Sequence, residues 1–337
     1  MLVRPLLILI AGVFMSVGFA PLPAASEEKN PVTIKEWTVP YEESRPRDPF
    51  AVSEKEVWFV GQRSSYLARL NPQDGSFEKH DLVDQAGPHN LIVGKDGIVW
   101  YAGNLKGYVG RFDPESGEIE KIAMPDPAAR DPHTLVFDAD QSHIWFTVQG
   151  GNFIGRVTVA DHKVDLIPVP TPRARPYGIR MAPDGTPWIV LFGTHKLASV
   201  NPESLELTEY EIPHEEARPR RLEITSGGDI YYADYVRGTV GLYDPVTRTV
   251  TEWPLPSGEK ARPYGTAIDA DDVVWIAETG VLPNQLVGFD TKSAEFVSVT
   301  AIPSGARSVR HMDYHAPSDT LWFGTDANTI GRAELGQ

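Results

Sequence analysis

A repeat of about 44 residues runs through the sequence and constrains the fold more than any other feature. Each unit carries an aromatic residue at a similar place, from Trp58 in the first unit to Trp322 in the last. The members between them are Trp100, Trp145, Trp188, Tyr231 and Trp275. A period of roughly 40 to 50 residues with a recurring Trp is typical of β-propeller blades. The sequence therefore predicts seven blades in a ring.

One unit, Arg175 to Pro213, indicates how a blade is built. Four short apolar or alternating segments follow one another, "YGIRMA", "TPWIVLF", "KLASVNP" and "LELTEYEIP". Gly, Pro, Asp and Asn separate them, as tight hairpins require. The third segment recurs in other units, for example as "YVGRFDP" and "TVGLYDP". We therefore predict an all-β fold with four strands in each blade.

The last unit ends after "TIGRAEL" without a fourth strand. Residues 32–40, "VTIKEWTVP", precede the first blade and resemble the fourth strands "VTEWPLP" and "LTEYEIP". We expect this N-terminal strand to complete blade seven, because pairing it there removes an exposed sheet edge. The predicted propeller is a single domain over residues 26–337. Each Trp is expected to pack between strands rather than to bind a sugar.

Residues 1–25 have the pattern of a secretory signal peptide. Arg4 precedes an apolar run from Leu6 to Ala20, and the small residues Ala24 and Ala25 come before an acidic start. The run is short for a membrane span, although an uncleaved anchor is the alternative. We expect a mature protein that is periplasmic or extracellular and does not bind a membrane after signal cleavage.

The charge balance limits the partners. The chain of 337 residues has a formal net charge of -15, which repels phosphate backbones, so no nucleic acid partner is expected. Cysteine is absent, which excludes disulfides and thiolate chemistry. We expect a monomer with a small-molecule or peptide ligand at the propeller mouth, and a protein partner is a further option.

Two positions in each unit should meet at one face of the ring. The first follows the proline that begins the inner strand, and the second lies three residues after the aromatic anchor. The first position is filled by Arg47, His89, His133, Tyr177, Arg220 and Tyr264. Blade seven lacks the proline, and Ser308 to Arg310 stand there with an open alignment. Glu278 holds the second position in blade six.

Arginine is frequent around these positions. We interpret a set of arginines as substrate-binding residues for an anionic or carboxylate-bearing ligand. The set is Arg45, Arg47, Arg175, Arg218, Arg220, Arg262 and Arg310, together with Tyr177. The alternative is that each arginine stacks on a neighbouring blade or binds a loop carbonyl.

Four residues are candidates for catalysis. Tyr264 and Glu278 stand at matched ends of adjacent strands, where a phenol and a carboxylate could share a proton. His89 and His133 occupy equivalent places in adjacent blades and could bind a metal or act as a base. Plain structural hydrogen bonds are the alternative for both pairs.

The repeated elements "GPHNL" or "RPYGI" at the start of a blade, "IGR" in its third strand and "EYEIP" at its end resemble the virginiamycin B lyase (streptogramin lyase) family over essentially the whole mature chain. The resemblance implies a seven-bladed propeller. It also implies a Mg²⁺-assisted elimination that opens a cyclic depsipeptide at its ester linkage.

Active members of that family carry Pro-His at the start of the last two blades, a Glu just before the final Pro-His, and a Glu three residues after the last anchor Trp. The matching positions here hold Tyr264, Ser308 and Val309, Ala306 or Arg307, and Thr325. A related acid-Pro-His pattern stands in blade three as Asp131, Pro132 and His133. Asp131 and His133 are therefore the predicted metal ligands of a rotated site.

Three functions stay open from the sequence. The first is a metal-assisted C–O lyase that acts on a cyclic ester or a related anionic substrate. The second is a non-catalytic propeller that binds an anionic ligand at its mouth. The third is a protein-interaction scaffold, because the fold alone does not decide among such uses.

Overall fold

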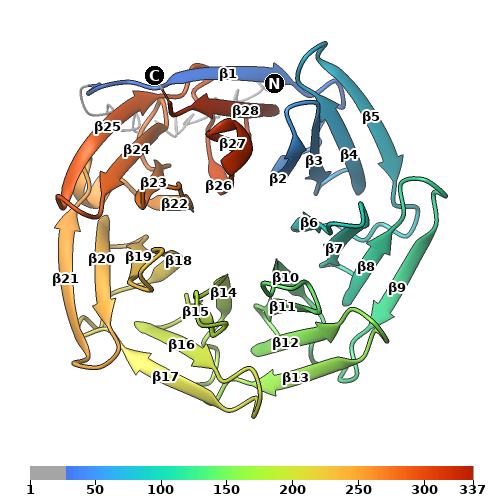
Figure 1. Cartoon of the computed structure of the whole chain (residues 1–337), viewed down its shortest axis with the longest axis horizontal. Helices are drawn as coiled ribbons and strands as arrows, with labels where there is room; N and C mark the ends of the chain where they lie inside the picture. The colour runs from blue at the N-terminus through green and yellow to red at the C-terminus, as the bar shows by residue number, and fades with distance from the viewer. Residues whose placement is uncertain (1–27, 337) are drawn as a thin grey trace, which may run out of the picture.

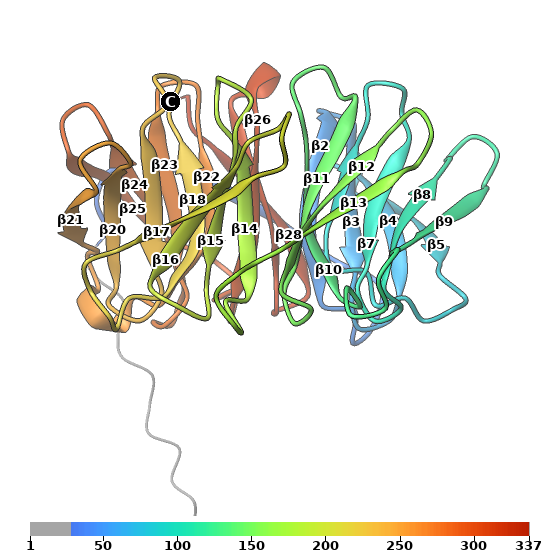
Figure 2. The same ribbon diagram turned by 90° about the horizontal axis from the view of Figure 1, so that it is seen from below.

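The computed structural model describes residues 28–336 and has the predicted fold. Figure 1 shows sheets arranged as blades around a central axis. The strands form seven sheets, each with four antiparallel strands. Figure 2 shows that the strands run through the thickness of the ring and that turns gather on its two faces. The predicted signal peptide over residues 1–25 lies outside the described residues.

Blades one to four follow the chain in order. Blade one contains β2 (Pro46–Ser53), β3 (Glu56–Gly61), β4 (Tyr66–Asn71) and β5 (Ser76–Asp81). Blade two contains β6 (Leu91–Val93), β7 (Val99–Gly103), β8 (Tyr108–Phe112) and β9 (Ile119–Ala123). Blade three contains β10 (Pro132–Phe137), β11 (His143–Val148), β12 (Phe153–Thr158) and β13 (Val164–Pro168). Blade four contains β14 (Pro176–Met181), β15 (Pro187–Leu191), β16 (Lys196–Val200) and β17 (Leu207–Glu211).

The remaining blades complete the circle. Blade five contains β18 (Pro219–Ile224), β19 (Ile230–Asp234), β20 (Thr239–Asp244) and β21 (Thr249–Pro254). Blade six contains β22 (Pro263–Ile268), β23 (Val273–Glu278), β24 (Gln285–Asp290) and β25 (Glu295–Ala301). Blade seven contains β26 (Val309–His315), β27 (Thr320–Thr325), β28 (Thr329–Glu334) and β1 (Thr33–Thr38). Two short 3₁₀ helices, η1 (Gly258–Lys260) and η2 (Ala316–Ser318), lie in connections.

The two ends of the described chain meet in blade seven. Strand β1 pairs antiparallel with β28, and Trp37 lies opposite Ile330 in that ladder. The Trp37 ring also stacks on Trp322, with ring centroids 5.6 Å apart. A bridge between Lys29 and Val299 then places the residues before β1 against blade six. The first strand thus covers what would be an open edge of the last sheet.

Glycine in the third strand of several blades allows close packing within the sheet. A Cβ on Gly110 would lie 2.1 Å from the Tyr101 ring, and one on Gly155 would lie 2.0 Å from the Phe146 ring. Both aromatic rings come from the second strand of the same blade and are fully buried. Each ring therefore occupies the space that a side chain at the glycine beside it would need.

No helix within residues 28–336 is long and apolar enough to cross a membrane.

Candidate axial anion site

The inner strands of the blades bring two consecutive residues toward the axis. In blade three, Pro132 pairs with Val148 and Leu135 pairs with Phe146, so His133 and Thr134 share the space of one residue. Consecutive side chains alternate between the two faces of a regular strand, whereas a β-bulge changes that alternation. The same register shift occurs in blades one, four, five, six and seven. Each bulge follows the first residue or two of the inner strand.

The register also settles the alignment of blade seven. Val309 pairs with Thr325, just as Pro263 pairs with Glu278 in blade six. Val309 therefore takes the place of the missing proline, and Arg310 is the seventh member of the ring of residues after it. We use the name axial cluster for ten residues at the two positions that follow the inner-strand proline, or Val309 in blade seven. They are Arg47, Asp48, His89, His133, Tyr177, Arg220, Arg221, Tyr264, Arg310 and His311.

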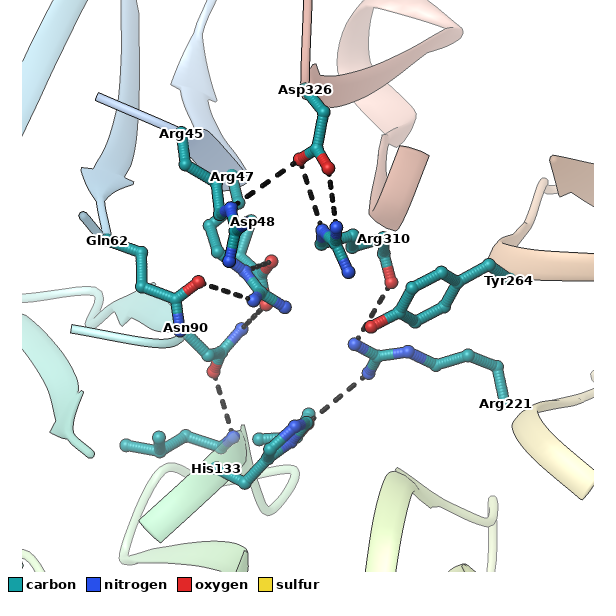
Figure 3. Close-up of polar contacts among 12 residues, drawn as sticks. Arg45, Arg47, Asp48, Gln62, Asn90, His133, Arg221, Tyr264, Arg310 and Asp326 are labelled. Carbon is teal, nitrogen blue, oxygen red and sulfur yellow. Dashed lines mark hydrogen bonds and ion pairs between the residues drawn. The ribbon is translucent and has the colours of Figure 1, made fainter. Parts of the chain in front are cut away.

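A buried ion pair holds one side of the axial cluster. The Asp48 carboxylate accepts a hydrogen bond from Arg47 Nε at 2.9 Å and another from Asn90 Nδ2 at 3.1 Å. Arg47 Nη1 donates to Gln62 Oε1 at 3.0 Å, and Figure 3 shows this network beside the axis. Burial raises the pKa of Asp48, but the charges of Arg47 and other cations outweigh it and hold the pKa below its usual value. Asp48 is therefore a carboxylate whose charge is already neutralised.

Arg221 crosses the axis from blade five. Its Nη1 donates to Thr134 Oγ1 at 3.3 Å and its Nη2 donates to the Arg310 carbonyl at 3.2 Å, as Figure 3 shows. The side chain is 1% exposed, and its Nε has no hydrogen-bond partner within the described chain. Among residues 28–336, no carboxylate lies within ion-pair distance of its guanidinium. A buried guanidinium without a paired carboxylate is costly, and the free Nε of Arg221 can donate a hydrogen bond to an anion.

Three histidines line the same cluster in their neutral form. The rings of His89 and His133 lie 3.5 Å apart between centroids, and His133 Nδ1 lies 2.8 Å from Thr134 Oγ1. Burial, followed by the charges of nearby arginines, lowers the pKa of His89 and His133 well below the usual value. The pKa of His311 is also well below the usual value, because burial and the charge of Arg221 lower it. The Nδ1 atoms of His89 and His311 are buried and have no hydrogen-bond partner among residues 28–336.

Tyr177 and Tyr264 meet on the other side of the axis. Their hydroxyls share a hydrogen bond, although the residues stand 87 positions apart. The guanidinium of Arg220 lies between their blades, 3.4 Å from the Tyr264 ring centroid and 5.3 Å from that of Tyr177. Tyr235 and Phe192 also contact Arg220 at 4.4 and 4.7 Å. Three neighbouring blades thus build an aromatic box around one cation.

The glycine of each RPYG copy allows a neighbouring inner strand to approach. A Cβ on Gly178 would lie 3.1 Å from the Arg220 carbonyl oxygen and from Arg221 Cα. A Cβ on Gly265 would lie 3.1 Å from a Val309 methyl carbon. Both distances are tight, so a larger residue there would push two blades apart.

The arginines before the inner-strand prolines lie at the rim rather than on the axis. Arg175 and Arg262 are exposed, and their guanidiniums lie 5.6 Å from the Phe192 and Tyr235 ring centroids respectively. Arg218 donates to the Glu215 carbonyl at 2.8 Å. Arg45 lies 3.9 Å from Asp326, whose carboxylate also accepts a 3.1 Å hydrogen bond from Arg310 Nε. Rim arginines therefore cover aromatic rings and bind loop carbonyls, in addition to facing solvent.

Glu278 and Tyr264 have different partners. Ser257 donates to Glu278 from its backbone nitrogen at 3.1 Å and also from its hydroxyl. Burial raises the pKa of this fully buried carboxyl group, and the hydrogen bonds from Ser257 oppose that rise. Tyr264 instead contacts Tyr177 and Arg220. The structure brings Tyr264, His89 and His133 to the axial cluster and places Glu278 against the loop before β22.

The residues of this chain do not fit a magnesium ion at the predicted positions. Mg²⁺ prefers an octahedron of oxygen ligands, several of them commonly carboxylates and waters. The Asp131 carboxylate instead accepts hydrogen bonds from the backbone nitrogens of Gly150 and Gly151, the latter at 2.8 Å. Residues 28–336 contain no group of three or more His, Asp or Glu residues that could hold a metal ion. A magnesium ion stays a prediction of the family resemblance.

Sequence reasoning did not place in the site the second position after the inner-strand proline, or after Val309. Asp48, Asn90, Arg221 and His311 all occupy it, and all are buried. The signal was present as adjacent polar pairs after the proline or its replacement, in "PRD", "PHN", "PRR" and "VRH". In a regular strand, consecutive side chains point to opposite faces, so only one of two neighbouring residues would be expected to face the axis.

Surface hollows lie near both ends of the axial cluster. A groove of about 830 Å³ between blades seven and one is lined by Arg45, Arg63, Arg307 and Asp326 among others. A smaller hollow of about 240 Å³ is lined by Arg180, Glu223 and Asp313. Asp326 connects the larger groove to the axis, because it binds Arg310 of the cluster.

The model of the virginiamycin B lyase family matches residues 28–284 of this chain. The chain belongs to the virginiamycin B lyase family. The match covers blades one to five, strands β22 and β23 of blade six and strand β1 of blade seven, and it includes eight of the ten residues of the axial cluster. No curated protein matches the sequence.

Solved structures of virginiamycin B lyases have the same fold. The selenomethionine-substituted enzyme from Staphylococcus aureus is 23% identical, with a TM-score of 0.80, over 90% of this chain and 99% of that one. A streptogramin B lyase is 20% identical, with a TM-score of 0.81, over 92% of this chain and 100% of that one. A catalytically inactive variant of the Staphylococcus aureus enzyme with quinupristin is 23% identical, with a TM-score of 0.79, over 90% and 99% of the two chains. At these identities the likeness establishes the fold.

Proposed function

We propose that this protein binds a small carboxylate-bearing molecule at the axial cluster. The observation that carries the proposal is the buried guanidinium of Arg221, which has an unpartnered Nε and no carboxylate at ion-pair distance within residues 28–336. A planar guanidinium binds a carboxylate through two parallel hydrogen bonds. An anion bound beside Arg221 would remove the cost of its burial.

Other unpartnered groups support the same ligand chemistry. Arg47 Nη2 is buried without a hydrogen-bond partner in the described chain, as are the Nδ1 atoms of His89 and His311. Positive charge gathers here in a protein with a net charge of -15. Because the chain as a whole is acidic, its overall charge does not favour an anion, and affinity must come from this local cluster. An imidazole that is neutral in the free protein can add a donor or accept a proton when the anion arrives.

Membership of the virginiamycin B lyase family favours a C–O lyase over a purely structural propeller as the activity of this site. The residues that this chain would use differ from those that active members carry at the last two blades. A secreted location, which the pattern of residues 1–25 predicts, fits a ligand taken from outside the cytoplasm.

The binding proposal can be tested by isothermal titration calorimetry with purified protein. The panel would contain citrate, malate, glucuronate, galacturonate and inorganic phosphate, with glucose and galactose as neutral controls. We expect at least one of the carboxylates to bind with a 1:1 stoichiometry and neither sugar to bind. Arg221→Met should weaken the binding at least 30-fold, because truncating one partner of a buried charge pair costs about 2 kcal/mol or more.

A matched variant separates the axial cluster from general surface charge. Arg248 is exposed, so Arg248→Met removes one positive charge away from the axis. Equal losses of carboxylate affinity in Arg221→Met and Arg248→Met would contradict a specific axial site. Binding of no carboxylate by the wild-type protein would contradict the proposal itself.

A further inference from the structure

The hydroxyl of Tyr264 lies in a buried environment dominated by cations. Arg220 lies 3.4 Å from its ring centroid, and Arg310 lies 5.5 Å from the same centroid. The Tyr177 hydroxyl shares a hydrogen bond with it from the neighbouring side. Figure 3 shows Tyr264 reaching toward the axis between Arg310 and Arg221. A phenol in this position has both a hydrogen-bond partner and positive charges to stabilise its ionised form.

The carboxylates near the axis are already paired with other residues. Asp48 binds Arg47, and Asp326 binds Arg310. Arg220 has no carboxylate at ion-pair distance within residues 28–336, and its closest contacts are aromatic rings. Burial raises the pKa of Tyr264, but the charges of Arg220, Arg47 and Arg310 outweigh it and lower the pKa to about 7. The surrounding guanidiniums therefore favour the phenolate form of Tyr264.

We propose that Tyr264 is the proton acceptor of a reaction at the axial cluster and removes the proton from the carbon next to the carboxylate of the bound molecule. This inference rests on the proposed binding function. A phenolate among guanidiniums combines the two requirements of carbon-acid chemistry, which are a base and a positive environment for the enolate that forms. Arg221 Nε and Arg47 Nη2 are the unpartnered donors available for that enolate.

The step balances without another reactant. The C–H bond breaks, the proton forms an O–H bond on Tyr264, and the electron pair becomes part of an enolate. If the adjacent carbon carries an oxygen substituent, the pair forms a C=C bond while the C–O bond breaks and the oxygen leaves with its electrons. Tyr264 then returns its proton to the departing oxygen or to water. Without such a substituent, the same proton acceptor exchanges the hydrogen with solvent.

The first experiment needs no ligand. A titration from pH 5 to 11 would record tyrosinate absorbance for the wild type, Tyr264→Phe and Tyr243→Phe. The hydroxyl of Tyr243 is buried without a hydrogen-bond partner among the described residues, which makes it a matched control. We expect one tyrosine of the wild type and of Tyr243→Phe to ionise near pH 7, and that step to be absent in Tyr264→Phe. Absence of any tyrosinate below pH 9 in the wild type would overturn the proposal.

The second experiment separates catalysis from binding. Wild type and Tyr264→Phe would be incubated in deuterium oxide with malate, glucuronate and galacturonate, and mass spectrometry would follow deuterium at the carbon next to the carboxylate and any unsaturated product. Tyr264→Phe should bind the same carboxylate in the calorimeter but process it at least about 100-fold more slowly. Equal rates in the two proteins, or binding without exchange or elimination in the wild type, would overturn the role of Tyr264. Loss of binding itself would count against the axial anion site instead.

Discussion

Tyr177 and Tyr264 come from two copies of the same tetrapeptide and bring their hydroxyls together in the axial cluster. The copies lie in blades four and six, and Arg220 from blade five lies between them. Burial raises the pKa of Tyr177, and the nearby Tyr264 raises it further, whereas Tyr264 has its pKa lowered to about 7. Two chemically identical groups thus differ in acidity, and Arg220 lies closer to the Tyr264 ring than to the Tyr177 ring.

The hydrogen bond from Tyr177 should contribute to the acidity of Tyr264. We predict that Tyr177→Phe raises the pKa of Tyr264 by about one unit, because it removes a donor to the charged form. The tyrosinate titration measures the shift directly. A midpoint that stays at the wild-type value would mean that the arginines alone control the ionisation.

Arg221 should contribute to function at the expense of stability. We predict that Arg221→Met increases the free energy of unfolding by about 1 kcal/mol, because a buried guanidinium without an anion is replaced by an apolar side chain of similar length. Urea denaturation without added anions measures this change. A loss of stability would show that the bonds to Thr134 and to the Arg310 carbonyl matter more than the unpaired charge.

Asp313 should make stability depend on pH. Burial raises its pKa to about 7, despite the opposing charge of Arg180. Below about pH 4 the carboxyl group is neutral in both the folded and the unfolded chain. Between about pH 4 and 7 the unfolded chain loses the proton first, so the free energy of unfolding falls as the pH rises and levels off above that range.

The variant Asp313→Asn removes this titration. We expect its melting temperature to exceed that of the wild type at pH 8 and to match it at pH 4, as measured by differential scanning calorimetry. A difference between the two proteins that is the same at both pH values would contradict a titrating Asp313.

Trp37 should be needed for the junction between the first and last strands. The side chain is 8% exposed and stacks on Trp322. We predict that Trp37→Ala lowers the free energy of unfolding by about 3 to 5 kcal/mol, the usual cost of emptying a large buried aromatic site. Chemical denaturation measures the loss. The exposed residue Val246 supplies a control, since Val246→Ala should change stability by less than about 0.5 kcal/mol.

The sequence contained enough to predict the blades but not the full site. The regular spacing of the aromatic anchors predicts a repeated sheet, because each anchor is buried at the same place in its blade. The bulges depend on how seven inner strands crowd together, and periodicity within one strand does not encode that crowding. Asp48 and Arg221 were therefore not selected, although they stand next to Arg47 and Arg220, which were.

The partners of the selected residues were also beyond sequence reasoning. Glu278 and Tyr264 occupy matched strand ends, yet the loop before β22 brings Ser257 to the carboxylate. Likewise, the side chain of Asp326 reaches Arg310 from the end of the neighbouring strand. Such contacts depend on loop paths and side-chain directions, which a strand register alone leaves open.

Within each blade, the residues that form the core and the residues that face the axis occupy different positions. The apolar core of a blade lies mainly in its second and third strands, such as β7 and β8, whereas most residues at the two positions after the inner-strand proline, or after Val309, are polar. Substitutions at those two positions can change the ligand chemistry around the axis while the scaffold persists. A lineage that keeps this scaffold can therefore exchange histidine for tyrosine or arginine, and acquire new substrates by local changes rather than by a new fold.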